Sequence, residues 1–265
     1  MRQFAGEFEI HLTVEPRAGE GGGEDPARLW AERYGLKYTR ILLDRGRTPD
    51  QPMLTGRGGG TLAGQRRVAR GWADRLREDG FRVARVKIEA APWNEEVPGT
   101  DAEALLLPGH CYFEHHLKLV LRESHLGAVR ALAESHSAHL SRNARREAAG
   151  GLHERFVTQR CRGVGRPEAG RRLDALVAAL KDAGYAIVEV EREFVVYDDN
   201  PGADSGWIAG DSAFPAVSVP VSAPILPVPV PVPVPVPSPA PVPGAAPSAT
   251  VRPPATVLRP ASRPA

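Results

Sequence analysis

The sequence has few cysteines and no long apolar run. Cys111 and Cys161 are the only two cysteines among 265 residues. Two cysteines are too few for a disulfide framework, and free thiols are typical of a reducing cytosol. No stretch of about 20 apolar residues is present to cross a membrane, and the first residues lack the uninterrupted apolar stretch of a signal peptide. We therefore expect a cytoplasmic protein with no membrane association.

Acidic residues are missing from the end of the chain. Segment 215–265 contains 17 of the 26 prolines, and its only charged residues are Arg252, Arg259 and Arg263. The other 214 residues carry a formal charge of −1, because the whole chain carries +2. A near-neutral body argues against extended nucleic-acid binding, which needs an excess of Lys and Arg. The Val-Pro repeats predict a disordered polyproline II tail, which would act as a spacer or dock on a protein partner.

Three segments of the first half recur in the second half in the same order. Residues 8–14 match 113–119, residues 53–57 match 156–160, and residues 79–83 match 183–187, with offsets of 105, 103 and 104. Such a repeat indicates an internal duplication. Alternating apolar residues, helical spacing and glycines after helices predict the order β-α-β-β-α-β in each copy. We therefore predict an α+β fold made of two ferredoxin-like copies.

The predicted domain boundaries follow from this repeat. They are a first copy at 1–92, a connecting segment at 93–109, a second copy at 110–198, a loop at 199–214 and the tail at 215–265. One face of a ferredoxin-like sheet packs on its two helices, so the open face of each small copy needs a cover. We expect the two open faces to meet or lie side by side, with a binding site in the cleft between them.

Strand alternation places candidate functional residues on these open faces. Imidazoles act as general base and general acid near neutral pH, so we predict His11 and His116 as the catalytic pair. Arginines fork onto phosphate oxygens, and hydroxyls donate hydrogen bonds to them. The glycine-rich run 56–60 is expected to open onto a helix N-terminus, where free amides favour anions. The predicted substrate-binding residues are Thr13, Lys118, Thr55, Arg57, Thr158 and Arg160.

The segment His11-Leu12-Thr13 resembles the His-x-Thr signature of two-histidine phosphoesterases. Those enzymes carry the signature twice, on equivalent strands of a duplicated fold, with both histidines facing one cleft. Here His116 takes the second histidine position, and Lys118 replaces the second threonine. The resemblance implies a phosphodiesterase that binds a small phosphorylated ligand or nucleotide and needs neither a metal nor another cofactor. Segments 139–143, 155–160 and 196–200 are also similar to a family of bacterial proteins with no assigned activity.

Two alternatives remain open. Glu189, Glu191 and Glu193 share one face of the last predicted strand, where they either hold Mg²⁺ or pair with basic residues across the cleft. The expected basic partners are Arg85, Lys87 and Arg160. The acidic segment 198–204 is expected to be a turn.

The function of the whole protein also has an alternative. In this second alternative, the protein is a non-catalytic interaction or regulatory module, and its polar residues form a structural ion network between the two copies.

Overall fold

The structure is a computed structural model, which describes residues 3–16, 24–143, 147–148 and 151–207. The chain divides into the units Met1–Val217 and Ser218–Ala265. The predicted proline-rich tail lies outside the described residues. Among the helices of the described ranges, none has the length and apolar character needed to cross a membrane.

The first half contains four strands and two helices in the predicted order. They are β1 (Ala5–Val14), α1 (Pro26–Arg33), β2 (Lys37–Leu43), β3 (Asp50–Thr61), α2 (Leu62–Glu78) and β4 (Val83–Ala90). The Asp25 side chain caps α1 by accepting a hydrogen bond from the amide of Ala27, and Pro26 takes the first helical turn. Gly80 follows α2 with a φ of 81°, a conformation that favours glycine after a helix.

The second half repeats this order with additions. It contains β5 (Tyr112–Arg122), η1 (Glu123–His125), α4 (Leu126–Ser135), β6 (Ala138–Asn143), β7 (Glu147–Ala148), β8 (Leu152–Arg162), α5 (Arg166–Asp182) and β9 (Ile187–Asp198). The connecting segment 93–109 forms a short helix, α3 (Asp101–Leu105), which the sequence pattern did not predict. A capping box of Thr100 and Glu103 stabilises its N-terminus. The 3₁₀ helix η2 (Pro201–Asp204) follows β9.

The strands form one antiparallel sheet that closes on itself. The first half contributes the order β4-β1-β3-β2, and β2 pairs with β6 of the second half. The second half continues as β6-β8-β5-β9, and β9 pairs back with β4. The inner faces of the two halves therefore enclose one interior. Of the two expected arrangements, the open faces meet instead of lying side by side.

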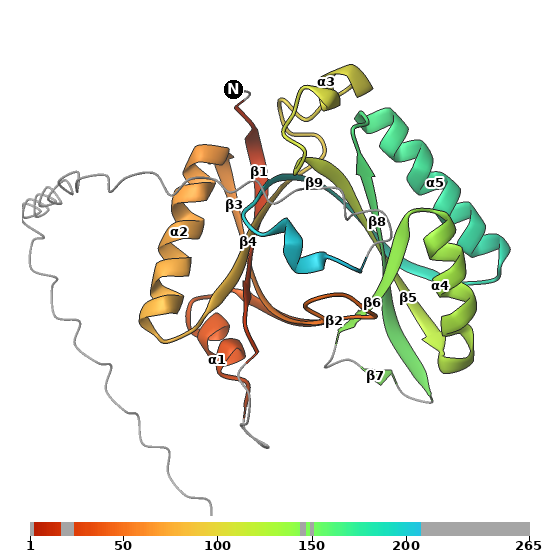
Figure 1. Ribbon diagram of the computed structural model, residues 1–265, viewed down its shortest axis with the longest axis horizontal. Helices are drawn as coiled ribbons and strands as arrows, with labels where there is room; N and C mark the ends of the chain where they lie inside the picture. The colour runs from red at the N-terminus through yellow and green to blue at the C-terminus, as the bar shows by residue number, and fades with distance from the viewer. Residues whose placement is uncertain (1–2, 17–23, 144–146, 149–150, 208–265) are drawn as a thin grey trace, which may run out of the picture. The chain divides into compact units, whose positions relative to one another are not determined.

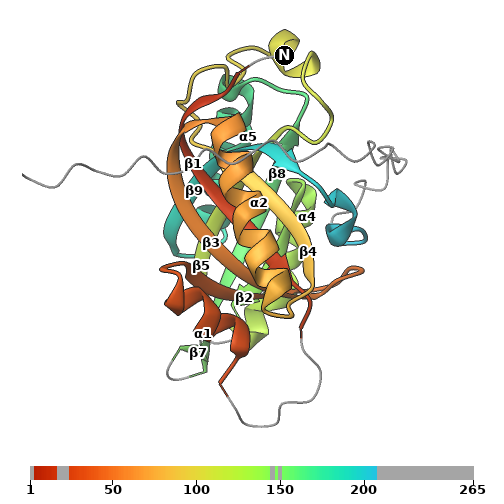
Figure 2. The same cartoon turned by 90° about the vertical axis from the view of Figure 1, so that its left-hand side faces the viewer.

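Helices cover the outer face of this sheet. Figure 1 shows α1 and α2 on one side and α4 and α5 on the opposite side, and Figure 2 shows α2 lying across strands of the first half. Ile10, Leu12 and Leu54 are fully buried beneath the first pair of helices, and Leu117 and Val157 beneath the second pair. The expected alternation is confirmed in β1, where Ile10 and Leu12 pack in the core beneath the helices and Glu9, His11 and Thr13 line the interior.

The glycine-rich run 56–60 belongs to β3 and leads, as expected, to the N-terminus of α2, which begins at Leu62 after the N-cap residue Thr61. Residues 56–60 pair with residues 6–10 of β1, so the run continues the sheet. A Cβ atom added at Gly56 would lie 2.3 Å from the indole ring of Trp72. Helix α2 can pack this closely against β3 only because residue 56 has no side chain.

The Gly56→Ala variant is expected to lose about 1–3 kcal/mol of unfolding free energy, because its methyl group overlaps the Trp72 ring. Chemical denaturation followed by circular dichroism measures this loss. Gly71→Ala is the matched control: Gly71 lies in α2, and nothing lies within 4 Å of a Cβ added there. That control should gain roughly 0.5–1 kcal/mol, since alanine favours a helix. Equal stability of the two variants would contradict the close contact between α2 and β3.

Candidate functional site

The interior of the closed sheet contains a cavity of about 160 Å³. Both halves of the chain contribute to its wall. Lys37 and Glu191 line the cavity and are also exposed, so it communicates with solvent on their side. The lining includes both predicted catalytic histidines, His11 and His116.

The two halves place the same side chains at equivalent points of this wall. In the pairing of β1 with β3, Glu9 lies opposite Arg57 and His11 lies opposite Thr55. In the pairing of β5 with β8, glutamate again lies opposite arginine and histidine opposite threonine, at Glu114–Arg160 and His116–Thr158. The last strand of each half adds one more glutamate, Glu89 in β4 and Glu193 in β9. We call the six residues Glu9, His11, Glu89, Glu114, His116 and Glu193 the central Glu/His cluster.

Two hydrogen bonds fix the orientation of His11. Its Nδ1 lies 2.9 Å from Oγ1 of Thr55, and its Nε2 lies 2.5 Å from Oε2 of Glu89. A threonine hydroxyl can either donate to Nδ1 or accept from it, so this contact is compatible with either ring tautomer. His11 is 8% exposed and Glu89 is 2% exposed. The imidazole is therefore buried next to a carboxylate that can take or return its proton.

His116 has the corresponding partners, with its glutamate at a longer distance. Its Nδ1 lies 2.9 Å from Oγ1 of Thr158, and its Nε2 lies 3.3 Å from Oε2 of Glu193. Burial alone lowers the pKa of His116, but the hydrogen bond to Glu193 and the charge of Glu114 outweigh it and raise the pKa to about 9. Burial raises the pKa of Glu193 to about 7, and the charge of Glu89 acts in the same direction. Imidazole and carboxyl groups with shifted pKa values thus face one cavity.

Lys87 makes the two halves different. Its Nζ lies 2.6 Å from Oε1 of Glu89 and 2.6 Å from Oε2 of Glu114, so it joins the glutamates of both halves. Glu114 also accepts a hydrogen bond from Nε of Arg160 at 2.7 Å. Burial raises the pKa of Glu114, but the charges of Lys87 and Arg160 outweigh it and lower the pKa to about 2. In the second half, Glu191 takes the place of Lys87 opposite the histidine.

The segment after β9 contributes a buried acid to the cavity. Asp204, at the end of the blue η2 in Figure 1, is 3% exposed. Its Oδ2 lies 2.8 Å from Nη1 of Arg85 and 2.6 Å from Nη2 of Arg160. Trp207 also lines the cavity, and its ring lies 5.3 Å from the Arg160 guanidinium. The segment predicted as a simple turn therefore closes part of the wall.

The structure brings most of the predicted substrate-binding residues to the cavity. Thr13, Thr55, Thr158 and Arg160 line it. Among the described residues, Arg57 and Lys118 remain outside the lining. The side chain of Arg57 is 76% exposed and contacts Glu9 at 2.7 Å, whereas Lys118 contacts Glu154 at 3.2 Å.

Two further expectations need correction or completion. Arg85 and Lys87 pair with Asp198, Asp204, Glu89 and Glu114 instead of Glu189, Glu191 and Glu193. Sequence reasoning also did not select Glu9, Glu89 and Glu114 as site residues. A signal for these glutamates was present in the sequence, because Glu-x-His recurs at 9–11 and 114–116.

Both cysteines are buried, and burial raises the pKa of Cys161 to about 11, which makes thiolate chemistry unfavourable there.

Comparisons with known proteins give no family for this chain. No protein-family model and no curated protein sequence matches it. Among solved structures, the crystal structure of aspartate kinase from Synechocystis is similar over 73% of this chain and 45% of that chain, with 11% identity and a TM-score of 0.21. The chain thus spans less than half of that protein, and a similarity at this level carries no argument about fold or function.

Acidification is expected to remove the stabilisation that Glu114 supplies. The folded-state pKa of Glu114, about 2, lies below the ordinary value of 4.5, so its contribution is present above pH 4.5 and is lost as the pH falls toward 2. Replacing it in Glu114→Gln should cost about 3 kcal/mol at pH 7, and this cost should shrink at pH 3. Urea denaturation at both values measures the difference. Glu78→Gln, an exposed glutamate of α2, should show little effect at either pH. A cost for Glu114→Gln that is independent of pH would contradict the ion pairing.

Proposed function

We propose that each half is one ferredoxin-like copy, that the cavity between them binds a small phosphorylated ligand, and that His11 and His116 act as the acid–base pair on a phosphoester. One observation carries this proposal. The His–Thr–Glu set occurs twice, and both histidines line the same cavity. General acid–base catalysis needs two such groups within reach of one substrate.

The proposed reaction is hydrolysis of a phosphodiester bond. A water molecule attacks phosphorus, and one imidazole takes the proton that the water loses. The bond from phosphorus to the leaving oxygen breaks, and the second imidazole gives that oxygen a proton. Glu89 and Glu193 keep the two rings oriented toward the cavity through contacts of 2.5 and 3.3 Å with the histidine Nε2 atoms.

The charges of the wall limit how a phosphate can bind. The described lining residues include six acidic residues, four lysines or arginines, and the two histidines. Arg160, the arginine of the lining that the sequence predicts to bind substrate, already contacts Glu114 and Asp204. A phosphate group in this cavity therefore needs a companion cation, or Arg160 must exchange a carboxylate for it.

The location and the macromolecular partners remain expectations. We propose a cytoplasmic protein, because Cys111 and Cys161 are both free and buried, as is usual in a reducing compartment. A protein partner for the proline-rich segment 215–265 stays a prediction, since that segment lies outside the described residues.

A second candidate function is a non-catalytic interaction or regulatory module, which the ion network favours. Arg160, Glu114, Lys87 and Glu89 form a continuous chain with contacts of 2.6 to 2.7 Å. Lys87 and Glu89 belong to the first half, and Glu114 and Arg160 belong to the second. In this case the charged residues hold the two halves together, and no substrate replaces them.

Hydrolysis of bis(p-nitrophenyl) phosphate and of cyclic nucleotides tests the first function, in buffers with and without Mn²⁺. His11→Asn and His116→Asn should each lower kcat/KM by about 100-fold or more, because each removes one proton-transfer group. His153→Asn is the control, since His153 lies outside the described lining of the cavity, and it should keep the wild-type rate.

The second function is favoured if the wild-type protein hydrolyses neither substrate. In that case inorganic phosphate, AMP and cyclic phosphates should also leave its melting temperature unchanged, because a ligand that binds only the folded state would raise it. Hydrolysis that survives in both histidine variants would contradict the acid–base assignment.

A further inference from the structure

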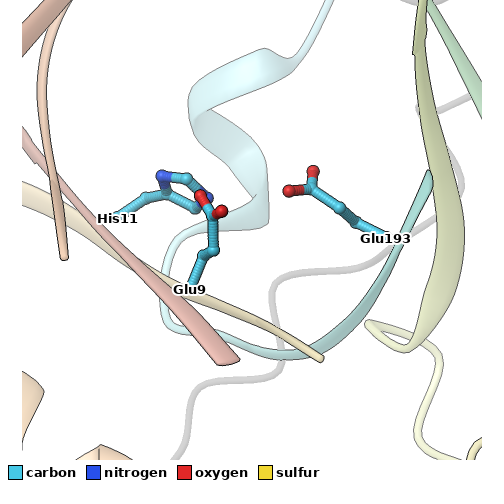
Figure 3. A group of neighbouring side chains, drawn as sticks. All are labelled: Glu9, His11 and Glu193. Carbon is cyan, nitrogen blue, oxygen red and sulfur yellow. The ribbon is translucent and has the colours of Figure 1, made fainter. Parts of the chain in front are cut away.

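The central Glu/His cluster contains two equivalent groups of three metal-ligating side chains. Glu9 and His11 of β1 converge with Glu193 of β9, and their candidate ligand atoms lie within 4.8 Å of one another. Figure 3 shows Glu193 pointing toward Glu9 and His11 from a different strand. The second group, Glu89, Glu114 and His116, meets the same 4.8 Å limit. Each group takes a Glu-x-His pair from one half and a single glutamate from the other half.

The second group already contains a positive charge from the chain itself. The ammonium group of Lys87 lies 2.6 Å from each of its two glutamates. In the other half, the residue equivalent to Lys87 is Glu191, so the first group has an acidic residue where the second has a cation. Arg57 contacts only one oxygen of the first group, Oε1 of Glu9, and its side chain is 76% exposed. His116 lies 3.3 Å from the other carboxylate, that of Glu193. Among the described contacts, the two carboxylates of the first group therefore have separate partners, whereas one ammonium joins both glutamates of the second group.

We propose that Glu9, His11 and Glu193 bind one divalent transition-metal ion, at the place equivalent to that of the Lys87 ammonium in the second group. Two carboxylates and one imidazole suit Mn²⁺, Fe²⁺ or Zn²⁺ better than Mg²⁺ or Ca²⁺, which prefer oxygen ligands alone. A dication also neutralises the charges of the two carboxylates, whose side chains are 23% and 16% exposed.

The contacts of His11 fit the role of a metal ligand. Its Nδ1 lies 2.9 Å from the Thr55 hydroxyl, which can accept the Nδ1 proton and leave the Nε2 lone pair for the metal. Second partners of this kind orient ligating histidines in metalloproteins. Glu89 lies 2.5 Å from the same Nε2, so the metal would displace the proton that these two groups share. Three protein ligands leave coordination positions for water or a bound oxyanion.

This inference goes beyond the proposed function, because the ion would bind whether or not a phosphoester is the substrate. The ion would also be the companion cation that a phosphate needs in this wall. A metal on Nε2 excludes His11 from proton transfer, because its Nδ1 contacts Thr55, so the metal-bound form and the acid–base pair assign different roles to this imidazole. The test uses the full chain without a polyhistidine tag, after dialysis against EDTA and removal of the chelator. Titration with Mn²⁺, in which electron paramagnetic resonance measures the free ion, should give one bound Mn²⁺ per chain.

Variants of the first group assign the site. Glu9→Gln and Glu193→Gln should each weaken Mn²⁺ binding by about tenfold or more, because each replaces a charged ligand with a neutral amide. Glu189→Gln is the matched control. Glu189 is an exposed glutamate of the same strand, four residues before Glu193 and outside both groups, and its variant should bind Mn²⁺ like the wild type. Circular dichroism confirms that each variant is folded.

The equivalence of the two groups gives a second test. Removing the ammonium in Lys87→Gln should make the three ligands of the second group available to a metal ion. The stoichiometry should then rise from one to two Mn²⁺ per chain. Mn²⁺ should then raise the melting temperature of this variant more than that of the wild type. The proposal is overturned if the wild type binds no Mn²⁺, or if binding is unchanged in both Glu9→Gln and Glu193→Gln. Metal binding without phosphodiesterase activity supports the metal site and contradicts the phosphoester proposal.

Discussion

Closure of the antiparallel sheet is the constraint on which the site depends. The pairing of β4 with β9 and of β2 with β6 turns the inner faces of both halves toward one interior. Charged side chains on those faces lose most of their water, and a buried charge without a partner costs several kcal/mol. The chain meets this requirement by alternating acids and bases, as in the contacts of Arg160, Glu114 and Lys87. The orientation of both histidines follows from the same network.

The network also explains why acid–base chemistry and cation binding involve the same residues. The oxygen of a carboxylate that orients an imidazole lies about as far from Nε2 as two ligand atoms on one metal ion lie from each other. Glu89 and Glu193 each contact the histidine of their own half and also belong to a group with the glutamate and histidine of the other half. A change in the charge of one half therefore alters the electrostatics of the other.

Alternation along the strands was sufficient to predict which side chains share a face, but not which strands pair. His11 and His116 could be assigned to inner faces from the repeat, and both line the cavity. Closure could not be derived, because the pairing of Ile41 with Asn143 joins residues that are far apart in the sequence. The position of Asp204 was also out of reach, since a loop has no periodicity that gives the direction of a side chain. The roles predicted for the site residues remain predictions.

The difference between Lys87 and Glu191 has a consequence for how such a protein can be built. A dimer of two identical half-length chains must carry the same residue at both of these positions, and therefore two lysines or two glutamates. With two lysines, each group of three ligands would contain its own positive charge. With two glutamates, neither group would contain one. A chain that contains both halves, unlike such a dimer of identical chains, can make one of the two groups self-neutralising and leave the other to an external partner. Fusion of the halves thus permits a chemical asymmetry that symmetric association of identical subunits forbids.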